Sequence, residues 1–352
     1  MASCLGMKHL EDDDAFCAGS EEEKEKMWGG MSDFVKTVHN AESTFYEFVR
    51  PFAEKIRMPK CYCSTKFTEQ NTTSAMIAMD YFEGVKVPQA HDLMTIEQVK
   101  DVARELGKLQ ALAYRHGINQ VEALKKKRDP FTSVWETFSL DQTIATLKQL
   151  VEYDDSEKFQ KTVDKVVELL PVYINSNLPA TLHLQMGLTP VIANGDLWCG
   201  NVLIDEKTNI IRSLIDWQVV HLSCGGQDLF HLTFTGMSSE QRIQHMEDIH
   251  DDLYASLVEN MEGETPPYTR EDLRLTSQLI LPHVGFLVGV MTMPMFKSAM
   301  DQSDWTDDEK KERTAVVFDK VRGILEDIVK YHELNKEYNE KLKFKQPDFW
   351  KE

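Results

Sequence analysis

Residues 191–220 form a short β-rich stretch inside a half of the chain whose pattern is otherwise helical. Two apolar runs flank a polar segment that carries Asp196 and, five positions later, Asn201. A second acid, Asp216, follows the next apolar run, Ile210–Ile215. Short apolar runs that alternate with polar turns are typical of β-hairpins. The stretch therefore predicts a hairpin inserted into a helical domain, with polar side chains at the strand ends.

This order of side chains suits phosphoryl transfer from ATP. The reaction needs a carboxylate to orient and deprotonate the attacking hydroxyl, and oxygen ligands to hold Mg²⁺ against the phosphates. Asp196, then Asn201, then Asp216 supply these parts in the order that kinases use. An alternative stays open, because Asn-Gly and Gly-Asn are common turn dipeptides and an Asp-x-x-x-x-Asn spacing occurs by chance in many proteins.

The first quarter of the chain has a mixed pattern. Residues 6–30 are polar, acidic and broken by glycines, which predicts a loop. Apolar residues at helical spacing predict a helix from Met31 to about Arg50, which ends before Pro51. Two short strands are predicted near residues 61–67 and 74–82, with Gln70-Asn71-Thr72 as the turn between them.

After Gly84 and Pro88 the pattern becomes helical. Over residues 97–116 apolar side chains recur at three-and-four spacing, which is one buried face of an amphipathic helix. The sequence therefore predicts an α+β fold with a small N-terminal part and a large, mainly helical C-terminal part. Further helices are predicted over residues 140–150, 157–170, 239–259, 270–296 and 307–341.

Composition and charge narrow the class of partner. The 352 residues carry a net charge of −19, and so acidic a surface repels the phosphates of nucleic acid and of anionic lipid. The apolar stretch Ile280–Met295 is short and contains Pro282 and His283, so a membrane span is not predicted. The N-terminus lacks the apolar core of a signal peptide, and the six cysteines lack disulfide or zinc spacing. We therefore expect a cytoplasmic protein.

Two other chemistries lack support in the sequence. His183, His221 and His231 have no companion at zinc-hydrolase spacing, so structural roles are predicted for them. The serines carry no Gly-x-Ser-x-Gly motif, which leaves esterase chemistry without a nucleophile.

Three segments resemble the aminoglycoside phosphotransferase/choline kinase superfamily: Asn194–Trp198 with Asn201, Ile215–Gln218, and Asp228–Leu229. Within the superfamily the chain looks similar to the CHK kinase-like, or ecdysteroid-kinase-like, branch of nematode and insect type. The resemblance implies a protein-kinase-like, two-lobed fold. In this interpretation the nucleotide-binding lobe covers residues 1–84, and the helical acceptor lobe covers residues 85–352.

The resemblance implies the cofactors ATP and Mg²⁺ and a role for each residue in the central motif. Asp196 would be the catalytic base, and Asn201 and Asp216 would bind Mg²⁺. Asn194, where the family usually has His, would be a structural hydrogen-bonding residue. Asp228 would be a buried carboxylate that holds the catalytic loop.

Residues of the N-terminal part would contact the nucleotide. Asp80, Tyr81 and Phe82 would present backbone groups to adenine, and Glu42 would pair with a phosphate-binding lysine. The family places that lysine and a glycine-bearing hairpin before the position of Ala2, so the resemblance implies a truncated N-terminal lobe in which Glu42 lacks its partner.

The function expected from these residues is ATP-dependent phosphorylation of a hydroxyl group on a small molecule. The acidic charge favours a neutral or cationic acceptor. The alternative is a catalytically weak or inactive pseudokinase that acts as a binding module. The sequence does not identify the acceptor.

Overall fold

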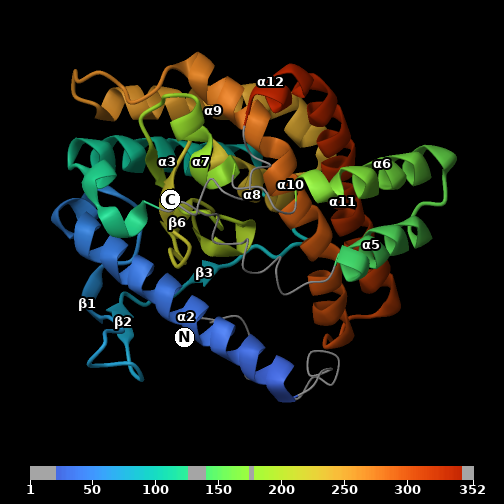
Figure 1. Cartoon of the computed structure of the whole chain (residues 1–352), viewed down its shortest axis with the longest axis horizontal. Helices are drawn as coiled ribbons and strands as arrows, with labels where there is room; N and C mark the ends of the chain where they lie inside the picture. The colour runs from blue at the N-terminus through green and yellow to red at the C-terminus, as the bar shows by residue number, and fades with distance from the viewer. Residues whose placement is uncertain (1–20, 126–139, 174–177, 343–352) are drawn as a thin grey trace.

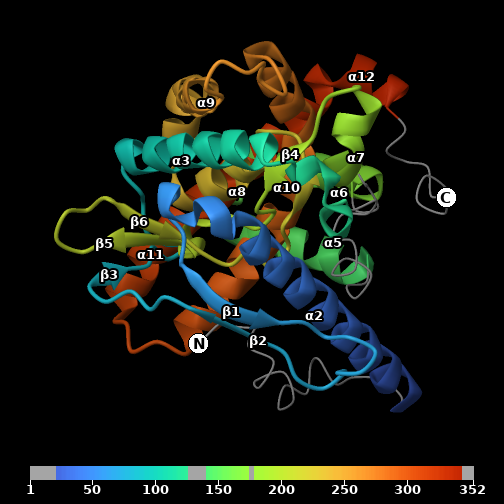
Figure 2. The same cartoon turned by 90° about the vertical axis from the view of Figure 1, so that its left-hand side faces the viewer.

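The N-terminal part of the protein is one long helix beside a two-stranded hairpin (Figures 1 and 2). The computed structural model describes residues 21–125, 140–173 and 178–342. Helix α2 (Glu21–Val49) lies beside strands β1 (Cys61–Thr65) and β2 (Met76–Met79), which pair in antiparallel fashion. The 3₁₀ helix η1 (Arg50–Lys55) follows α2 and contains Pro51 in its first turn.

The start of α2 corrects one prediction. Residues 21–30 are helical, although the sequence pattern predicts a loop over residues 6–30; residues 6–20 lie outside the described part of the chain. The segment Glu21–Met27 consists of Glu, Lys and Met, which are strong helix formers. Their combined preference outweighs the cost of about 1 kcal/mol for each of Gly29 and Gly30 in a helix interior.

Two small antiparallel sheets occupy the predicted β-rich stretch. In the first, β3 (Val85–Lys86) pairs with β5 (Val202–Asp205), which pairs with β6 (Ile211–Leu214). In the second, β4 (Val191–Ala193) pairs with β7 (His221–Ser223). Strand β3 begins at Val85 and pairs with β5 of the C-terminal part. We therefore propose that the division between the two lobes lies after Gly84, at the predicted boundary.

The remaining elements are helices, and the fold is α+β as predicted. In the described ranges four helices start with a capping box, in which a Ser or Thr side chain and the side chain three residues later bond each other's backbone N–H. The helices are α3 (Ile96–Arg115), α5 (Leu140–Gln149), α6 (Glu157–Tyr173), α7 (Leu178–Gln185), α8 (Gln227–Gly236), α9 (Ser239–Asn260), α10 (Arg270–Asp301), α11 (Asp307–Leu334) and α12 (Lys336–Lys341).

Most predicted helices match these bounds, but α7 and α8 are absent from the prediction. Both are short, and every residue of α8 is buried. A helix that is buried on all sides has no solvent-exposed face, so its sequence lacks the amphipathic periodicity on which the prediction depends. The predicted helix over residues 307–341 is divided at Asn335 into α11 and α12.

Helix α3 lies between α9 and the strands β5 and β6 in both views (Figures 1 and 2). The contact between α3 and α9 depends on Gly107, because a Cβ there would lie 2.1 Å from the backbone oxygen of Leu253 in α9. Two hydrophobic clusters form the core. One joins α2, α3, α9 and the strands, and the other joins α5, α6, α7, α10 and α11. The site described below lies at the edge of the first cluster.

Helix α10 is long and apolar enough to cross a membrane when only length and composition are considered. Of its most apolar 18-residue window, 72% is buried inside the protein, as expected of a core helix. No other helix in the described ranges meets the same criterion.

A buried histidine of α9 makes the stability of the protein sensitive to acid. Among the described residues His250 has no hydrogen-bond partner for either ring nitrogen, and burial lowers its pKa from 6.5 to about 4. Between these two values the unfolded chain binds a proton that the folded protein excludes, so stability falls as the pH falls from 6.5 to 4. Fully developed, this effect corresponds to about 3 kcal/mol.

We expect the free energy of unfolding to fall less in His250→Leu than in the wild-type protein as the pH is lowered from 7 to 4.5. Urea unfolding at several pH values measures this difference. His245→Leu is the control, because His245 lies on the same helix and is partly exposed. An unchanged pH dependence in His250→Leu would contradict the assignment.

Candidate active site

The two small sheets hold a loop, residues 194–201, between β4 and β5. Its start is fixed by Asp228, the second residue of α8, whose two carboxylate oxygens accept the backbone N–H groups of Asn194 and Gly195, both at 2.8 Å. Gly195 has φ +87°, and a Cβ there would lie 2.8 Å from the Val219 oxygen, so glycine is required. Burial raises the pKa of Asp228 to about 6, while the two N–H bonds favour its ionised form.

Asn194 connects the two acids of the motif. Its side-chain N–H₂ donates to the backbone oxygen of Asp216 at 2.8 Å, and its side-chain oxygen accepts the backbone N–H of Asp196 at 3.0 Å. A neutral amide can make both bonds at once, since it offers a donor and an acceptor. The residue thus bonds both the loop and the strand end, and the structural role expected of it stays a prediction.

Asn201 is fixed in a similar way. Its side-chain N–H₂ donates to the backbone oxygen of Asp196 at 2.8 Å, and its own backbone oxygen accepts the N–H of Ile215 at 3.0 Å. With the amide nitrogen fixed by this bond, the side-chain oxygen has a set direction. The structure therefore brings Asp196, Asn201 and Asp216 together, as the sequence predicts.

Asp196 is enclosed by protein on most sides, but 29% of its side chain is exposed. Burial, and then the charges of Asp216 and Asp228, raise its pKa to about 8. Among the described residues, the basic group within ion-pair distance is His231, whose Nδ1 lies 3.9 Å from Asp196 Oδ1. Burial lowers the pKa of His231 to about 3, so this histidine is neutral at pH 7 and offers no countercharge.

Helix α2 reaches the second acid through Glu42. Its carboxylate accepts the backbone N–H of Trp217 at 3.2 Å, and the rings of Phe45 and Trp217 stack with centroids 4.3 Å apart. Burial, and then the charge of Asp216, raise the pKa of Glu42 to about 7. Asp216 has φ +61°, a backbone conformation that is uncommon for residues other than glycine, and burial raises its pKa as well.

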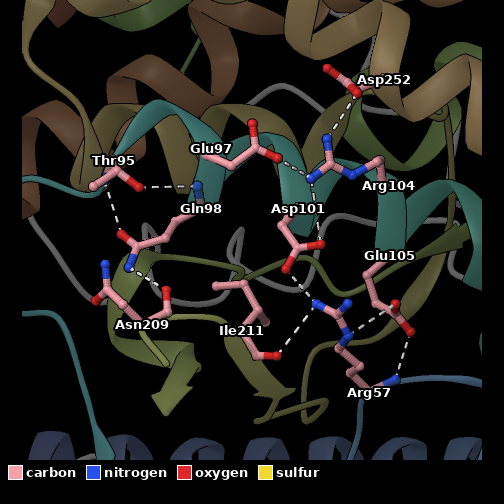
Figure 3. Close-up of polar contacts among 10 residues, drawn as sticks. All are labelled: Arg57, Thr95, Glu97, Gln98, Asp101, Arg104, Glu105, Asn209, Ile211 and Asp252. Atoms are coloured by element: carbon pink, nitrogen blue, oxygen red, sulfur yellow. Dashed lines mark hydrogen bonds and ion pairs between the residues drawn. The ribbon is translucent and has the colours of Figure 1, made fainter. Parts of the chain in front are cut away.

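A second contact from the N-terminal part fixes the strand that leads into Asp216. Figure 3 shows Arg57 between α3 and β6, where its guanidinium bonds Asp101 and, at 3.3 Å, the backbone oxygen of Ile211. The backbone N–H of Arg57 donates to Glu105 at 2.6 Å, and its oxygen accepts the N–H of Leu214 at 2.9 Å. No sequence pattern predicts this contact, because each of its partners lies 44 or more positions from Arg57 along the chain.

The predicted adenine contacts lie just after β2. The Asp80 carboxylate accepts the Lys60 N–H at 3.0 Å and the Tyr62 hydroxyl at 2.6 Å, and the Asp80 N–H donates to the Lys60 oxygen. Tyr81 is 85% exposed, and Phe82 lies under the Arg212 guanidinium. No described contact joins these three residues to Asp196 or Asp216. Their role at the nucleotide remains a prediction.

Four acids with raised pKa values thus lie around the loop, and the charges of Asp216 and Asp228 act on Asp196 while the charge of Asp216 acts on Glu42. In the described ranges, no Lys or Arg forms an ion pair with Glu42, Asp196, Asp216 or Asp228, and no three His, Cys, Asp or Glu side chains are arranged to hold a metal ion. Mg²⁺ is usually bound by one or two carboxylates together with phosphate oxygens and water. The Asp216 carboxylate and the Asn201 oxygen fit such a partial ligand set, and the excess negative charge favours a cation.

The fold and this loop define an α+β protein with an acid–amide–acid site at the strand ends. Its family model is described as "Uncharacterized oxidoreductase dhs-27" and matches residues 1–336, so the chain belongs to that family. A comparison with curated proteins gave no match.

Solved structures with a similar arrangement include small-molecule kinases. Choline kinase from Cryptosporidium parvum is 13% identical, with a TM-score of 0.41 over 84% of this chain and 78% of that one. Choline kinase LicA from Streptococcus pneumoniae is 13% identical, with a TM-score of 0.36 over 82% and 80%. Aminoglycoside 2'-phosphotransferase-IIIa in its GDP complex is 12% identical, with a TM-score of 0.36 over 83% of each chain. Likeness this distant does not bear on activity or substrate.

Proposed function

We propose that this protein is an ATP-dependent phosphotransferase that phosphorylates a hydroxyl group of a small molecule. The observation that carries the proposal is the bonding of Asp196, Asn201 and Asp216 into one unit through the Asn194 side chain and backbone oxygens. The sequence motifs that resemble the aminoglycoside phosphotransferase/choline kinase superfamily, and within it the CHK kinase-like branch, support the same reaction.

Each residue of the unit has a distinct part in the proposed reaction. Asp196, whose side chain is 29% exposed, would accept the proton of the acceptor hydroxyl and orient its oxygen. Asp216 and Asn201 would hold Mg²⁺, which when bound neutralises charge on the ATP phosphates. Asn194 and Asp228 would keep the loop in place. Glu42 would act on the same site through the Trp217 N–H, which its carboxylate accepts.

The family's description names an oxidoreductase, but the described residues do not form the usual binding site for a nicotinamide dinucleotide. Nicotinamide dinucleotides usually bind at the ends of parallel strands, behind a glycine-rich turn. All strand pairs in the described ranges are antiparallel, and the sequence has no G-x-G-x-x-G motif. The geometry therefore supports phosphotransfer better.

An assay for ADP release, run with Mg·ATP against a panel of neutral and cationic hydroxylated compounds, tests the proposal. We expect turnover with at least one acceptor and a requirement for Mg²⁺. Titration calorimetry with Mg·ATP, and separately with NADH, completes the test. Binding of Mg·ATP without turnover on any acceptor would favour the pseudokinase binding module. NADH binding without Mg·ATP binding would refute the proposal.

A further inference from the structure

Lys320, in the middle of α11, is a lysine with no exposed surface. Its ammonium donates to the backbone oxygens of Ala90 at 2.8 Å, Asp92 at 2.6 Å and Thr235 at 2.5 Å. Transfer of an ammonium group from water into a protein interior is costly unless each of its donors is satisfied. Three short bonds to oxygens satisfy all three N–H groups. Burial lowers the pKa of Lys320 to about 8, so the group is charged at neutral pH.

The three oxygens belong to two segments that Lys320 holds together. Ala90 and Asp92 lie in the linker between β3 and α3, and Thr235 is in the last turn of α8. The backbone oxygens of a helix C-terminus lack partners within the helix and carry partial negative charge, so a buried cation is favourable there. A second bond joins the same segments, since the N–H of Met94 donates to the Gly236 oxygen at 2.8 Å.

The C-terminal end of α8 also bonds the last residues of the loop 194–201, which we call the catalytic loop. The Thr235 hydroxyl accepts the backbone N–H of Cys199 at 2.9 Å, and the Cys199 thiol lies 3.6 Å from the oxygens of Gln89 and Thr235. Asp228 binds the start of the same loop from the other end of α8. The loop is therefore bonded to α8 at its start, Asn194 and Gly195, and near its end, at Cys199, which lies two residues before Asn201.

We infer that Lys320 is a positioning residue, which fixes the exit of the catalytic loop by bonding the end of α8 to the linker over residues 89–94. The effect of Lys320 on catalysis rests on the proposed function, whereas its effect on the position of the loop does not. Without the ammonium, three buried oxygens lose their donor, and the end of α8 is free to shift together with Cys199 and Asn201. Displacement of a catalytic group by about 1 Å can cost on the order of 100-fold in rate.

Hydrogen exchange followed by mass spectrometry tests this inference without any activity. In Lys320→Met we expect amide exchange to accelerate by about tenfold or more in the segments 89–94 and 195–202, and to change little in α6. Lys330→Met is the matched control, since Lys330 is exposed on the same helix. Lys320→Gln, which keeps two N–H donors without the charge, should give a smaller effect and is measured in the same way if the Met variant does not fold.

Kinetics of the same variants provide a second readout. With an acceptor from the ADP-release assay, Lys320→Met should lower kcat by about tenfold or more and change KM for ATP by less than about threefold, at a temperature where circular dichroism shows it folded. Unchanged exchange in the segment 195–202, or equal acceleration in every segment, would overturn the inference. If the wild-type protein transfers no phosphoryl group, the proposed function fails, while the exchange result still decides the role of Lys320.

Discussion

Asp196→Asn is expected to lower phosphotransferase activity by about 10²–10⁴-fold, the usual contribution of a general base. The substitution keeps the shape of the side chain and leaves the backbone bond from Asp196 to Asn194 in place. It removes an acid that Asp216 and Asp228 repel, so the metal-free protein should be at least as stable as the wild type. The loss should appear in kcat.

ADP-release kinetics and titration with Mg·ATP measure this prediction. Asp205→Asn is the control, because Asp205 is an acid at the end of β5 that faces solvent and accepts bonds only from its own turn. A variant at position 196 that keeps more than about a tenth of the wild-type rate is incompatible with a base there. Normal Mg·ATP binding together with lost turnover would support it.

The second large effect separates a metal ligand from a structural acid. Asp216→Ala should abolish Mg²⁺-dependent ATP binding, because Mg²⁺ loses its charged oxygen ligand. Its fold should survive, since the bond that joins position 216 to Asn194 uses the backbone oxygen. Asp228→Ala leaves two buried N–H groups without an acceptor, at a cost of about 1–3 kcal/mol for each. It should therefore unfold at a lower denaturant concentration.

Calorimetry with Mg·ATP and urea unfolding of both variants provide the comparison. The two effects should be separable, with lost binding in the first variant and lost stability in the second. If Asp228→Ala is as stable as the wild type while Asp216→Ala binds Mg·ATP normally, the two roles are wrongly assigned.

The central motif was predictable because it is local. Asp196 and Asn201 lie in one loop, and Asp216 ends the second strand of the adjoining hairpin, so their spacing along the chain implies their proximity in space. The helices with capping boxes and an apolar face were predictable for the same reason.

The residues that hold the motif in place were not predictable. Lys320, Arg57 and Thr235 act on backbone atoms of distant segments, and a bond to a backbone atom leaves no mark on the identity of the partner residue. Helix α8, which carries both Asp228 and Thr235, was itself missed because it is short and buried on every side, so its polar and apolar residues do not alternate between an exposed and a buried face. The sequence thus predicts the candidate reactive side chains but not the distant residues whose hydrogen bonds hold them in position.

The bonding of the loop to α8 has a consequence for how the site meets its substrates. A loop attached only to the surface opens whenever its own bonds break, but one attached near both ends to a wholly buried helix opens only when the core opens. The reactive groups should thus be preorganised for as long as the protein stays folded. The described site lacks positive charge to balance its carboxylates. Its side chains are therefore in position before a substrate binds, whereas the negative charge is balanced only when a cation such as Mg²⁺ arrives with the nucleotide.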